Sequence, residues 1–198
     1  MQDQYKKLHQ ISQPKFSFRF CPVCGNPLRT LRLKQNEPHR LVCSKCDFIL
    51  YLDPKLAVSS IVEMNGGIVL VKRDIGPMKG SWVTPGGYVD RGEEVKEAAI
   101  RETVEECGIL TRVKDLLGVY SYTGRLVVVI TFISEYISGD LIAGDEVQDV
   151  KLCRSSEIPW DDMAFQSTTA SLEDYYHLKK RHNIPSKLKE PQSAFDRA

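Results

Sequence analysis

The sequence predicts an α/β protein in which a layered α/β/α domain follows a small cysteine-rich module. Three observations predict this fold class. Strand-like apolar segments lie in the middle of the chain with a helix near each end of that region, and two C-x2-C pairs precede it. We expect strands at residues 56–64, 67–73, 82–84, 118–122, 126–136 and 148–153, and helices at 93–107 and 168–180.

Turn residues separate these elements. Asn65-Gly66 lies between two apolar runs and predicts a tight hairpin, and Gly108 ends the first helix as a C-terminal cap. Asp53-Pro54 marks a domain boundary. The predicted segments are a polar leader at 1–18, the cysteine-rich module at 19–52, the main domain at 53–182 and a flexible tail at 183–198.

Composition bounds the function classes. The chain has 198 residues, of which 42% are hydrophobic, and this is enough for a packed core. The 27 basic and 26 acidic side chains give a net charge of +1, so there is no global basic field for nucleic acid. No apolar run reaches the length of a membrane span, and the first residues do not resemble a signal peptide. We therefore expect a cytoplasmic protein without a membrane partner.

The spacing of the six cysteines predicts a zinc site. Two C-x2-C pairs are separated by eighteen residues, within the range typical of zinc ribbons. Two such turns present four thiolates to one ion in a tetrahedral shell, and the alternative is a pair of disulfides. The expected zinc ligands are Cys21, Cys24, Cys43 and Cys46, whereas Cys107 and Cys153 are expected in the core.

One 23-residue stretch, Gly87 to Ile109, carries the strongest motif of the chain. Its fixed positions are Gly87, Glu93, Arg101, Glu102, Glu105, Glu106 and Gly108. They match the Nudix signature G-x5-E-x7-R-E-U-x-E-E-x-G-U, in which U is apolar, and only Thr103 departs from a soft position. A chance match of seven fixed letters is on the order of one in a million. The chain thus resembles the Nudix hydrolases, which cut diphosphates linked to a nucleoside.

The helix of this motif has the pattern of a metal site. Glu102, Glu105 and Glu106 share one helix face, where each pair of like charges costs roughly 0.2–0.5 kcal/mol. A divalent cation reverses the sign of this effect, and Mg²⁺ prefers such oxygen ligands. A solvated acidic face is the alternative. On the opposite face of the helix, we expect Ile100, Val104 and Cys107 to pack on the sheet.

The resemblance implies a sandwich of helices around a mixed sheet, and catalysis with Mg²⁺ or Mn²⁺. It assigns the carbonyl of Gly86 and the three glutamates as ligands of that metal, and Arg101 as the residue that holds Glu102. Glu146 is the expected extra ligand or general base, with Asp145 and Asp149 as alternatives. The implied reaction is attack of water on phosphorus, with Glu102 or Glu146 as the base.

The substrate class follows from the order of the modules. A zinc ribbon before a Nudix domain, and the segment 157–167, resemble pyrophosphatases active on ADP-ribose and FAD. NADH pyrophosphatases are more distant, because their S-Q-P-W-P-F-P-x-S motif is absent here. We expect the protein to release AMP from a nucleoside diphosphate-linked metabolite. The resemblance also makes a homodimer possible, because Nudix pyrophosphatases are often dimers. Candidate substrate contacts are Arg73, Trp82, Gly87 and Phe165, with Tyr120 and Tyr122 as further stacking candidates.

Alternatives from other classes remain. NADH pyrophosphatases and hydrolases that sanitise damaged nucleoside triphosphates use the same motif. A non-catalytic ligand sensor or nucleic-acid-binding module is a third possibility. The complete set of acids argues against a sensor, and the basic residues of the ribbon, Arg29, Arg32, Lys34 and Arg40, are interpreted as a solvated face without a stripe of exposed aromatics.

Overall fold

The computed structural model describes residues 18–182, so the predicted leader, except for Phe18, and the predicted tail lie outside the described residues. The chain divides into two compact units. The smaller unit contains the described residues up to Lys55 together with Tyr122–Val127, and the larger contains Leu56–Ser121 and the described residues from Val128 onward. None of the described helices is long and apolar enough to cross a membrane.

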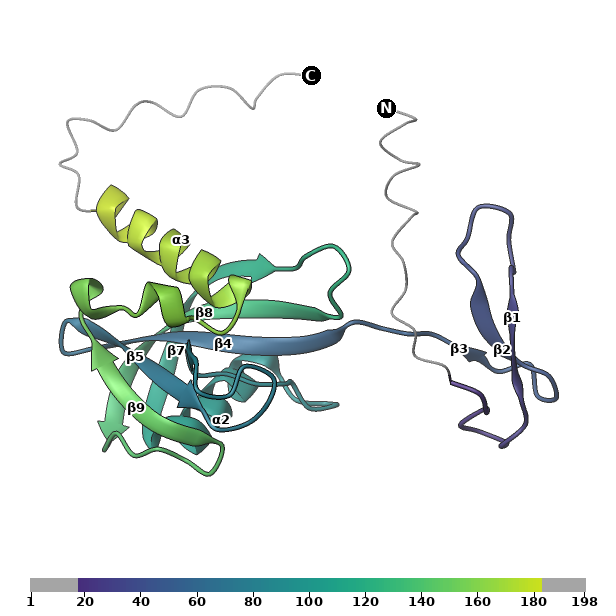
Figure 1. The fold of residues 1–198 in the computed structure, drawn as a ribbon, viewed down its shortest axis with the longest axis horizontal. Coiled ribbons are helices and arrows are strands. Elements are labelled where there is room, and N and C mark those ends of the chain that lie inside the picture. The colour runs from purple at the N-terminus through teal and green to yellow at the C-terminus, as the bar shows by residue number, and fades with distance from the viewer. Residues whose placement is uncertain (1–17, 183–198) are drawn as a thin grey trace, which may run out of the picture. The chain divides into compact units, whose positions relative to one another are not determined.

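A six-stranded sheet forms the centre of the larger unit (Figure 1). Its main path runs β6-β5-β4-β8-β7, and β9 pairs with β5. Antiparallel ladders join β4 to β5, β5 to β6 and β9, and β7 to β8. The elements are β4 (Lys55–Met64), β5 (Gly67–Arg73), β6 (Trp82–Val83), α2 (Val95–Cys107), β7 (Ile109–Tyr120), β8 (Val127–Gly139), β9 (Val147–Cys153), the 3-10 turns η1 (Ser155–Glu157) and η2 (Trp160–Asp162), and α3 (Gln166–His182).

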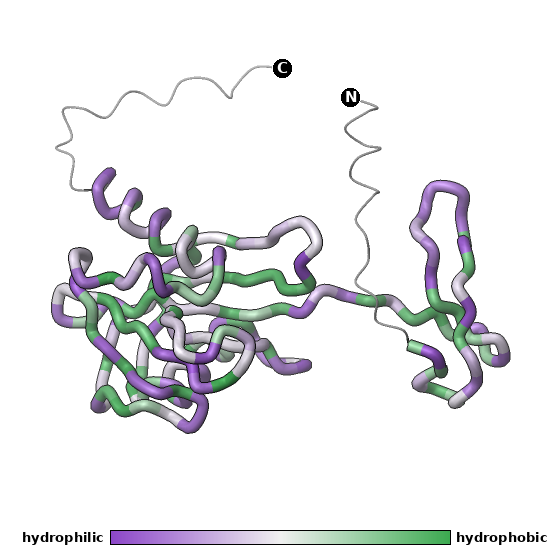
Figure 2. Tube along the Cα trace, in the orientation of Figure 1, coloured by the Kyte–Doolittle hydropathy of each residue, from purple (hydrophilic) through white to green (hydrophobic). Residues whose placement is uncertain are grey.

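Helices α2 and α3 cover opposite faces of this sheet, as the packing of alternate strand residues shows. Successive residues of a strand point to opposite faces. Ile61 and Leu70 pack in one core cluster with Leu172 of α3, whereas Val62 packs in a second cluster with Cys107 of α2. The strands between the helices are accordingly among the most hydrophobic parts of the unit (Figure 2). The larger unit is therefore an α/β/α sandwich, as predicted.

The hairpin and the central strands match the prediction, but β7 does not. Asn65 and Gly66 have positive φ angles of 45° and 78°, as their hairpin turn requires. The strand predicted from residue 118 instead begins at Ile109, directly after the left-handed cap Gly108, whose φ is 72°. The prediction was wrong because β7 is an edge strand, and its exposed charged side chains conceal the alternation of its buried ones.

The buried face of α2 also differs from the prediction. Its buried residues are Ala98, Ala99, Thr103 and Cys107, whereas Val104 is 44% exposed. Thr103, the unusual letter of the motif, donates its hydroxyl to the carbonyl of Ala99 at 2.7 Å. That hydrogen bond satisfies the hydroxyl within the core, so the position accepts a polar residue. The helix therefore turns a face of small side chains, rather than large aliphatic ones, to the sheet.

A separate three-stranded antiparallel sheet forms the smaller unit. Its strands follow the order β1-β2-β3, and β1 pairs with β2 through Leu31 opposite Arg40. The strands are β1 (Leu28–Leu31), β2 (Arg40–Cys43) and β3 (Ile49–Leu50). Such a small sheet cannot bury enough apolar surface to be stable alone, so an additional cross-link is expected to stabilise it.

Candidate active site and metal centre

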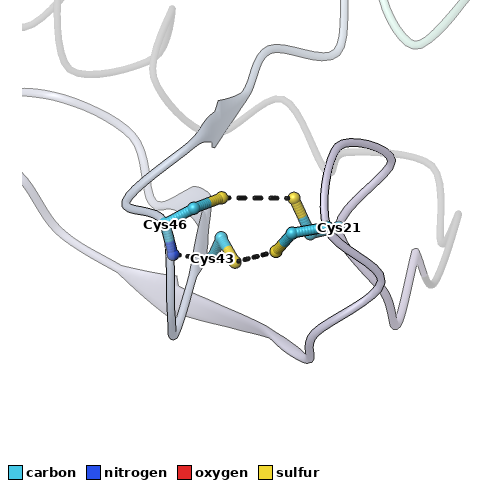
Figure 3. Close-up of side chains that lie close together, drawn as sticks. Cys21, Cys43 and Cys46 are labelled. Atoms are coloured by element: carbon cyan, nitrogen blue, oxygen red, sulfur yellow. Dashed lines mark hydrogen bonds between the residues drawn. The ribbon is translucent and has the colours of Figure 1, made fainter.

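The four predicted zinc ligands meet in the smaller unit, where Figure 3 labels Cys21, Cys43 and Cys46. Their sulfur atoms all lie within 4.8 Å of one another, with Cys21 and Cys46 at 3.8 Å and Cys24 and Cys43 at 3.4 Å. Sulfurs around a tetrahedral zinc stand about 3.8 Å apart, given a Zn–S bond of about 2.3 Å. Backbone N–H groups of the two C-x2-C turns point at the sulfurs of Cys21 and Cys43. The arrangement fits one zinc ion, and all six cysteines of the chain are free rather than disulfide-bonded.

The proton affinities of these thiols also favour a metal. The backbone N–H of Asn26 and the neighbouring thiols lower the pKa of Cys24 to about 6. The backbone of Phe48 favours the thiolate of Cys46, but the thiols of Cys24 and Cys43 outweigh it and raise the pKa of Cys46 to about 12. Four thiolates cannot coexist here without a cation, and a zinc ion would allow all four to ionise.

We expect Cys21→Ser to release zinc and to unfold the smaller unit, because the hydroxyl is a poor zinc ligand and the sheet has little core of its own. Metal analysis should give about one zinc per chain for the wild type and close to none for the variant. Cys153→Ala is the matched control, since Cys153 lies in the core of the larger unit. Unchanged zinc content in Cys21→Ser would contradict the assignment.

The loop Pro85-Gly86-Gly87, which precedes α2, packs closely against β4 and the helix. The carbonyls of Pro85 and Gly87 accept hydrogen bonds from strand β4, while the N–H of Gly86 donates to Oε2 of Glu106 at 2.8 Å. A Cβ at Gly86 would lie 2.2 Å from the carbonyl oxygen of Val58, and one at Gly87 would lie 2.5 Å from the carboxylate of Glu102. Both positions therefore require glycine for close approach.

Arg101 binds the carboxylates of Glu93, Glu102 and Glu105. Its Nε and Nη2 bind both oxygens of Glu93 at 2.7 and 3.0 Å, and its Nη1 binds Glu102 at 2.8 Å and Glu105 at 3.0 Å. Its Nη2 also donates to the carbonyl of Tyr88 at 3.1 Å. The hydrogen bonds from Arg101 and from the Asp90 backbone lower the pKa of Glu93 to about 2. One guanidinium thus fixes three carboxylates and the loop before the helix.

Glu106 lies deeper than the other glutamates. Burial raises its pKa to about 7, against the opposing effect of the Gly86 hydrogen bond, and the charges of Glu102 and Glu146 act in the same direction as burial. Arg73 partly offsets them. Burial likewise raises the pKa of Glu102. Burial and the neighbouring acids therefore disfavour the ionised forms of these two carboxyl groups.

This donor set fits a hard divalent cation. Carboxylate oxygens and a backbone carbonyl are the ligands that Mg²⁺ and Mn²⁺ prefer, and a cation beside Glu106 would favour the ionised form that burial disfavours. The carboxylates are not drawn into one tight cluster. Among the described residues, only the four cysteines bring three or more candidate ligand atoms within 4.8 Å, because Arg101 holds Glu102 and Glu105 while Gly86 holds Glu106.

Glu146 follows a loop that is anchored to the end of α2, and its charge acts on Glu106. The N–H groups of Ile142 and Gly144 donate to the carbonyls of Cys107 and Glu106 at 2.9 and 3.2 Å. A Cβ at Gly144 would lie only 1.9 Å from the carbonyl oxygen of Glu105. This contact was missed from the sequence, although a glycine two residues before the candidate acid was a usable signal. Glu146 and its alternatives Asp145 and Asp149 are all exposed, so exposure does not distinguish them.

We expect Gly144→Ala to lower activity at least tenfold and stability by roughly 1–3 kcal/mol, because the loop must move away from α2 and carry Glu146 with it. Steady-state kinetics and thermal melts measure the two effects. Gly76→Ala is the matched control, since its added Cβ would meet no atom within 4 Å. Equal activity of the two variants would contradict a positioning role for the loop.

The substrate candidates lie in different environments. The guanidinium of Arg73 stacks over the ring of Phe165 at 5.1 Å, and its charge acts on Glu106, so this pair is near the carboxylates. Gly87 contacts Glu102, as described above. Trp82 packs instead against the core on the α3 face, and Tyr120 donates its hydroxyl to Asp174 of α3 at 2.9 Å. Tyr122 belongs to the segment grouped with the smaller unit.

Comparison with known families agrees with this geometry. A family model described as NUDIX domain matches residues 53–173, and a zinc-ribbon model described as Nudix N-terminal matches residues 19–52. The ADP-ribose pyrophosphatase of Methanocaldococcus jannaschii is 43% identical over 134 residues, which cover 66% of this chain and 78% of that protein. The NAD-capped RNA hydrolase NudC of Pseudomonas aeruginosa is 28% identical over 71% of this chain, and the match spans only 49% of its length.

Solved structures show the same fold. A NUDIX hydrolase from Nitrosomonas europaea superposes with a TM-score of 0.78 at 32% identity, and the match covers 85% of this chain and 95% of that one. A MutT NUDIX hydrolase from Burkholderia pseudomallei gives a TM-score of 0.56 at 27% identity, covering 62% and 98% of the two chains. With its complete motif, its sandwich fold and these relatives, the chain belongs to the Nudix hydrolase family, in the branch that carries an N-terminal zinc ribbon.

Proposed function

We propose that the protein hydrolyses the diphosphate bond of nucleoside diphosphate-linked metabolites such as ADP-ribose or FAD, and releases AMP. The observation that carries this proposal is the convergence of the motif acids, since Arg101 binds three of them and Gly86 binds Glu106. The 43% identity to an ADP-ribose pyrophosphatase supports the choice of substrate class. We propose that the zinc ribbon spans residues 19–52 and the hydrolase domain residues 53–182, the limits expected from the sequence.

In this proposal Glu102, Glu105, Glu106, Glu146 and the carbonyl of Gly86 hold Mg²⁺ or Mn²⁺. The bound ions would neutralise the charge of the diphosphate and lower the pKa of the attacking water. Glu102 and Glu146 are the two candidates that accept the proton of that water.

The residues around the carboxylates would position the substrate. Arg101 orients Glu102 and Glu105 by charge-assisted hydrogen bonds, which restricts their rotation before substrate arrives. Arg73 is the cation available to a substrate phosphate, and its stacking on Phe165 fixes the guanidinium plane. Gly87 lets the loop backbone approach the ligand closely. Trp82 remains a candidate stacking residue only if a substrate reaches the α3 side of the sheet.

The test is AMP release in Mg²⁺ and then Mn²⁺ across ADP-ribose, FAD, NADH, diadenosine polyphosphates and an oxidised dGTP, with Glu105→Gln beside the wild type. Glu105 is the most exposed of the three glutamates, so its amide variant should fold normally and lose turnover. Turnover of ADP-ribose or FAD that is absent in the variant is the expected result. Preference for NADH or for the oxidised nucleotide would move the substrate assignment, and turnover equal in both proteins would refute the proposed site.

A further inference from the structure

The sheet of the smaller unit places basic and apolar side chains on one face. Arg29 and Leu31 lie two residues apart on β1, so they point to the same face of the sheet. Their partners on β2 are Val42 and Arg40. Residues directly opposite one another in an antiparallel pair point to the same face. The guanidinium of Arg40 lies 5.1 Å from the centre of the Tyr51 ring, which places this tyrosine on the same face, directly after β3. We name the set Arg29, Leu31, Arg40 and Tyr51 the ribbon face.

The positive charge of the smaller unit is largely unpaired. Residues 18–52 contain six lysines and arginines, namely Arg19, Arg29, Arg32, Lys34, Arg40 and Lys45, and only two acidic residues, Glu37 and Asp47. Within residues 19–52, Lys34 is the one of these six cations that forms an ion pair, with Glu37 at 3.1 Å. Four thiolates around one zinc would subtract two charges, and the unit would still be positive. In the larger unit, by contrast, cations such as Arg101 and Arg112 are bound to carboxylates.

Large apolar rings accompany these charges. Tyr51 is 55% exposed and Phe20 is 64% exposed within this unit. The connection between β1 and β2 is mostly hydrophilic (Figure 2), and Gln35 and Asn36 are exposed in it. Exposed rings beside unpaired arginines are the elements of a stacking platform for nucleobases, because the rings stack on bases and the cations contact phosphates.

We propose that the ribbon face binds single-stranded RNA. The described ribbon contains no helix that could enter a groove, so the bases must be unpaired to stack on Tyr51. The amides of Gln35 and Asn36 offer both donors and acceptors to ribose 2′-hydroxyls, which favours RNA over DNA. The sequence alone suggested a solvated face, because Arg29, Arg40 and Tyr51 are far apart in the chain and only the strand register brings them together.

The test is fluorescence anisotropy of the full chain with a labelled 12-nucleotide RNA that carries a 5′-hydroxyl and therefore offers no diphosphate to the hydrolase. Tyr51→Ala should weaken binding at least fivefold through lost stacking, and Tyr51→Phe should restore it. Arg29→Glu should weaken binding and make its salt dependence shallower by about one contact. Arg181→Glu, at an exposed arginine of α3, is the matched charge control and should bind more tightly than Arg29→Glu.

Zinc content and ADP-ribose turnover should stay at wild-type levels in all of these variants, which separates the RNA-binding face from the proposed hydrolase site. Equal affinity of wild type and Tyr51→Ala would overturn the proposal, as would equal weakening by Arg181→Glu. Equal affinity for DNA of the same sequence would overturn the assignment to RNA. Self-association that Tyr51→Ala abolishes, without RNA binding, would assign the face to a second copy of the chain instead.

Discussion

Replacing Glu106 by glutamine should lower kcat/KM by a factor on the order of 10²–10³ and, in buffer without divalent cations, raise the melting temperature. The two effects have one cause. Burial raises the pKa of Glu106 to about 7, so the folded protein must ionise a buried carboxylate at neutral pH. The amide keeps the acceptor for the Gly86 N–H and removes the charge. The Glu106 carboxylate, which the bound cation would require, therefore destabilises the folded protein when no cation is bound.

The pH dependence gives this prediction its sign. An acid whose folded pKa is raised stabilises the fold below its unfolded pKa of 4.5, and that contribution is lost as pH rises through the folded pKa of about 7. The stability advantage of Glu106→Gln should therefore be absent near pH 4.5 and reach on the order of 2–3 kcal/mol above pH 7. Thermal melts across this range measure it.

Glu105→Gln is the matched comparison, because the Glu105 side chain is 57% exposed and its charge carries no comparable burial cost. This variant should lose turnover without becoming more stable. A Glu106→Gln variant that melts below the wild type at every pH would show that burial does not destabilise the ionised carboxylate of Glu106.

Local periodicity and motif spacing were sufficient to predict most of the fold. The Asn65-Gly66 hairpin and strand β5 depend on turn chemistry and on short-range alternation, which a sequence displays directly. The early start of β7 was missed because an edge strand exposes half of its residues and takes charged ones there. The buried face of α2 was misplaced because small residues pack on the sheet, and side-chain hydrophobicity alone favours Val104 over Thr103.

The candidate site shows a similar division. Spacing on one helix indicated that Glu102, Glu105 and Glu106 share a face, but it could not indicate which of them is buried. That difference arises from the loop: Gly86 donates to Glu106 from twenty residues earlier in the chain. The anchoring of Gly144 on the end of α2 and the meeting of Arg40 with Tyr51 are also long-range contacts. Such contacts depend on tertiary packing, which local patterns do not encode.

Arg101→Lys should reduce turnover by at least tenfold and destabilise the larger unit by about 1–3 kcal/mol, although the charge is conserved. The guanidinium binds Glu93 through two nitrogens and still reaches Glu102, Glu105 and the carbonyl of Tyr88. A lysine ammonium is a single point on a flexible stem and cannot make these contacts together. Kinetics with ADP-ribose and thermal melts are the measurements.

Arg112→Lys is the control for this substitution. Arg112 also binds a carboxylate, that of Glu135, but its side chain is 70% exposed, and exposed ion pairs contribute about 0–1 kcal/mol. The control should therefore be nearly silent in both measurements. If the two variants behave alike, charge alone holds the motif acids in place. If only Arg101→Lys fails, the planar fork of the guanidinium is required, because a single rigid donor then holds Glu93 before the helix and Glu102 and Glu105 on it at the same time.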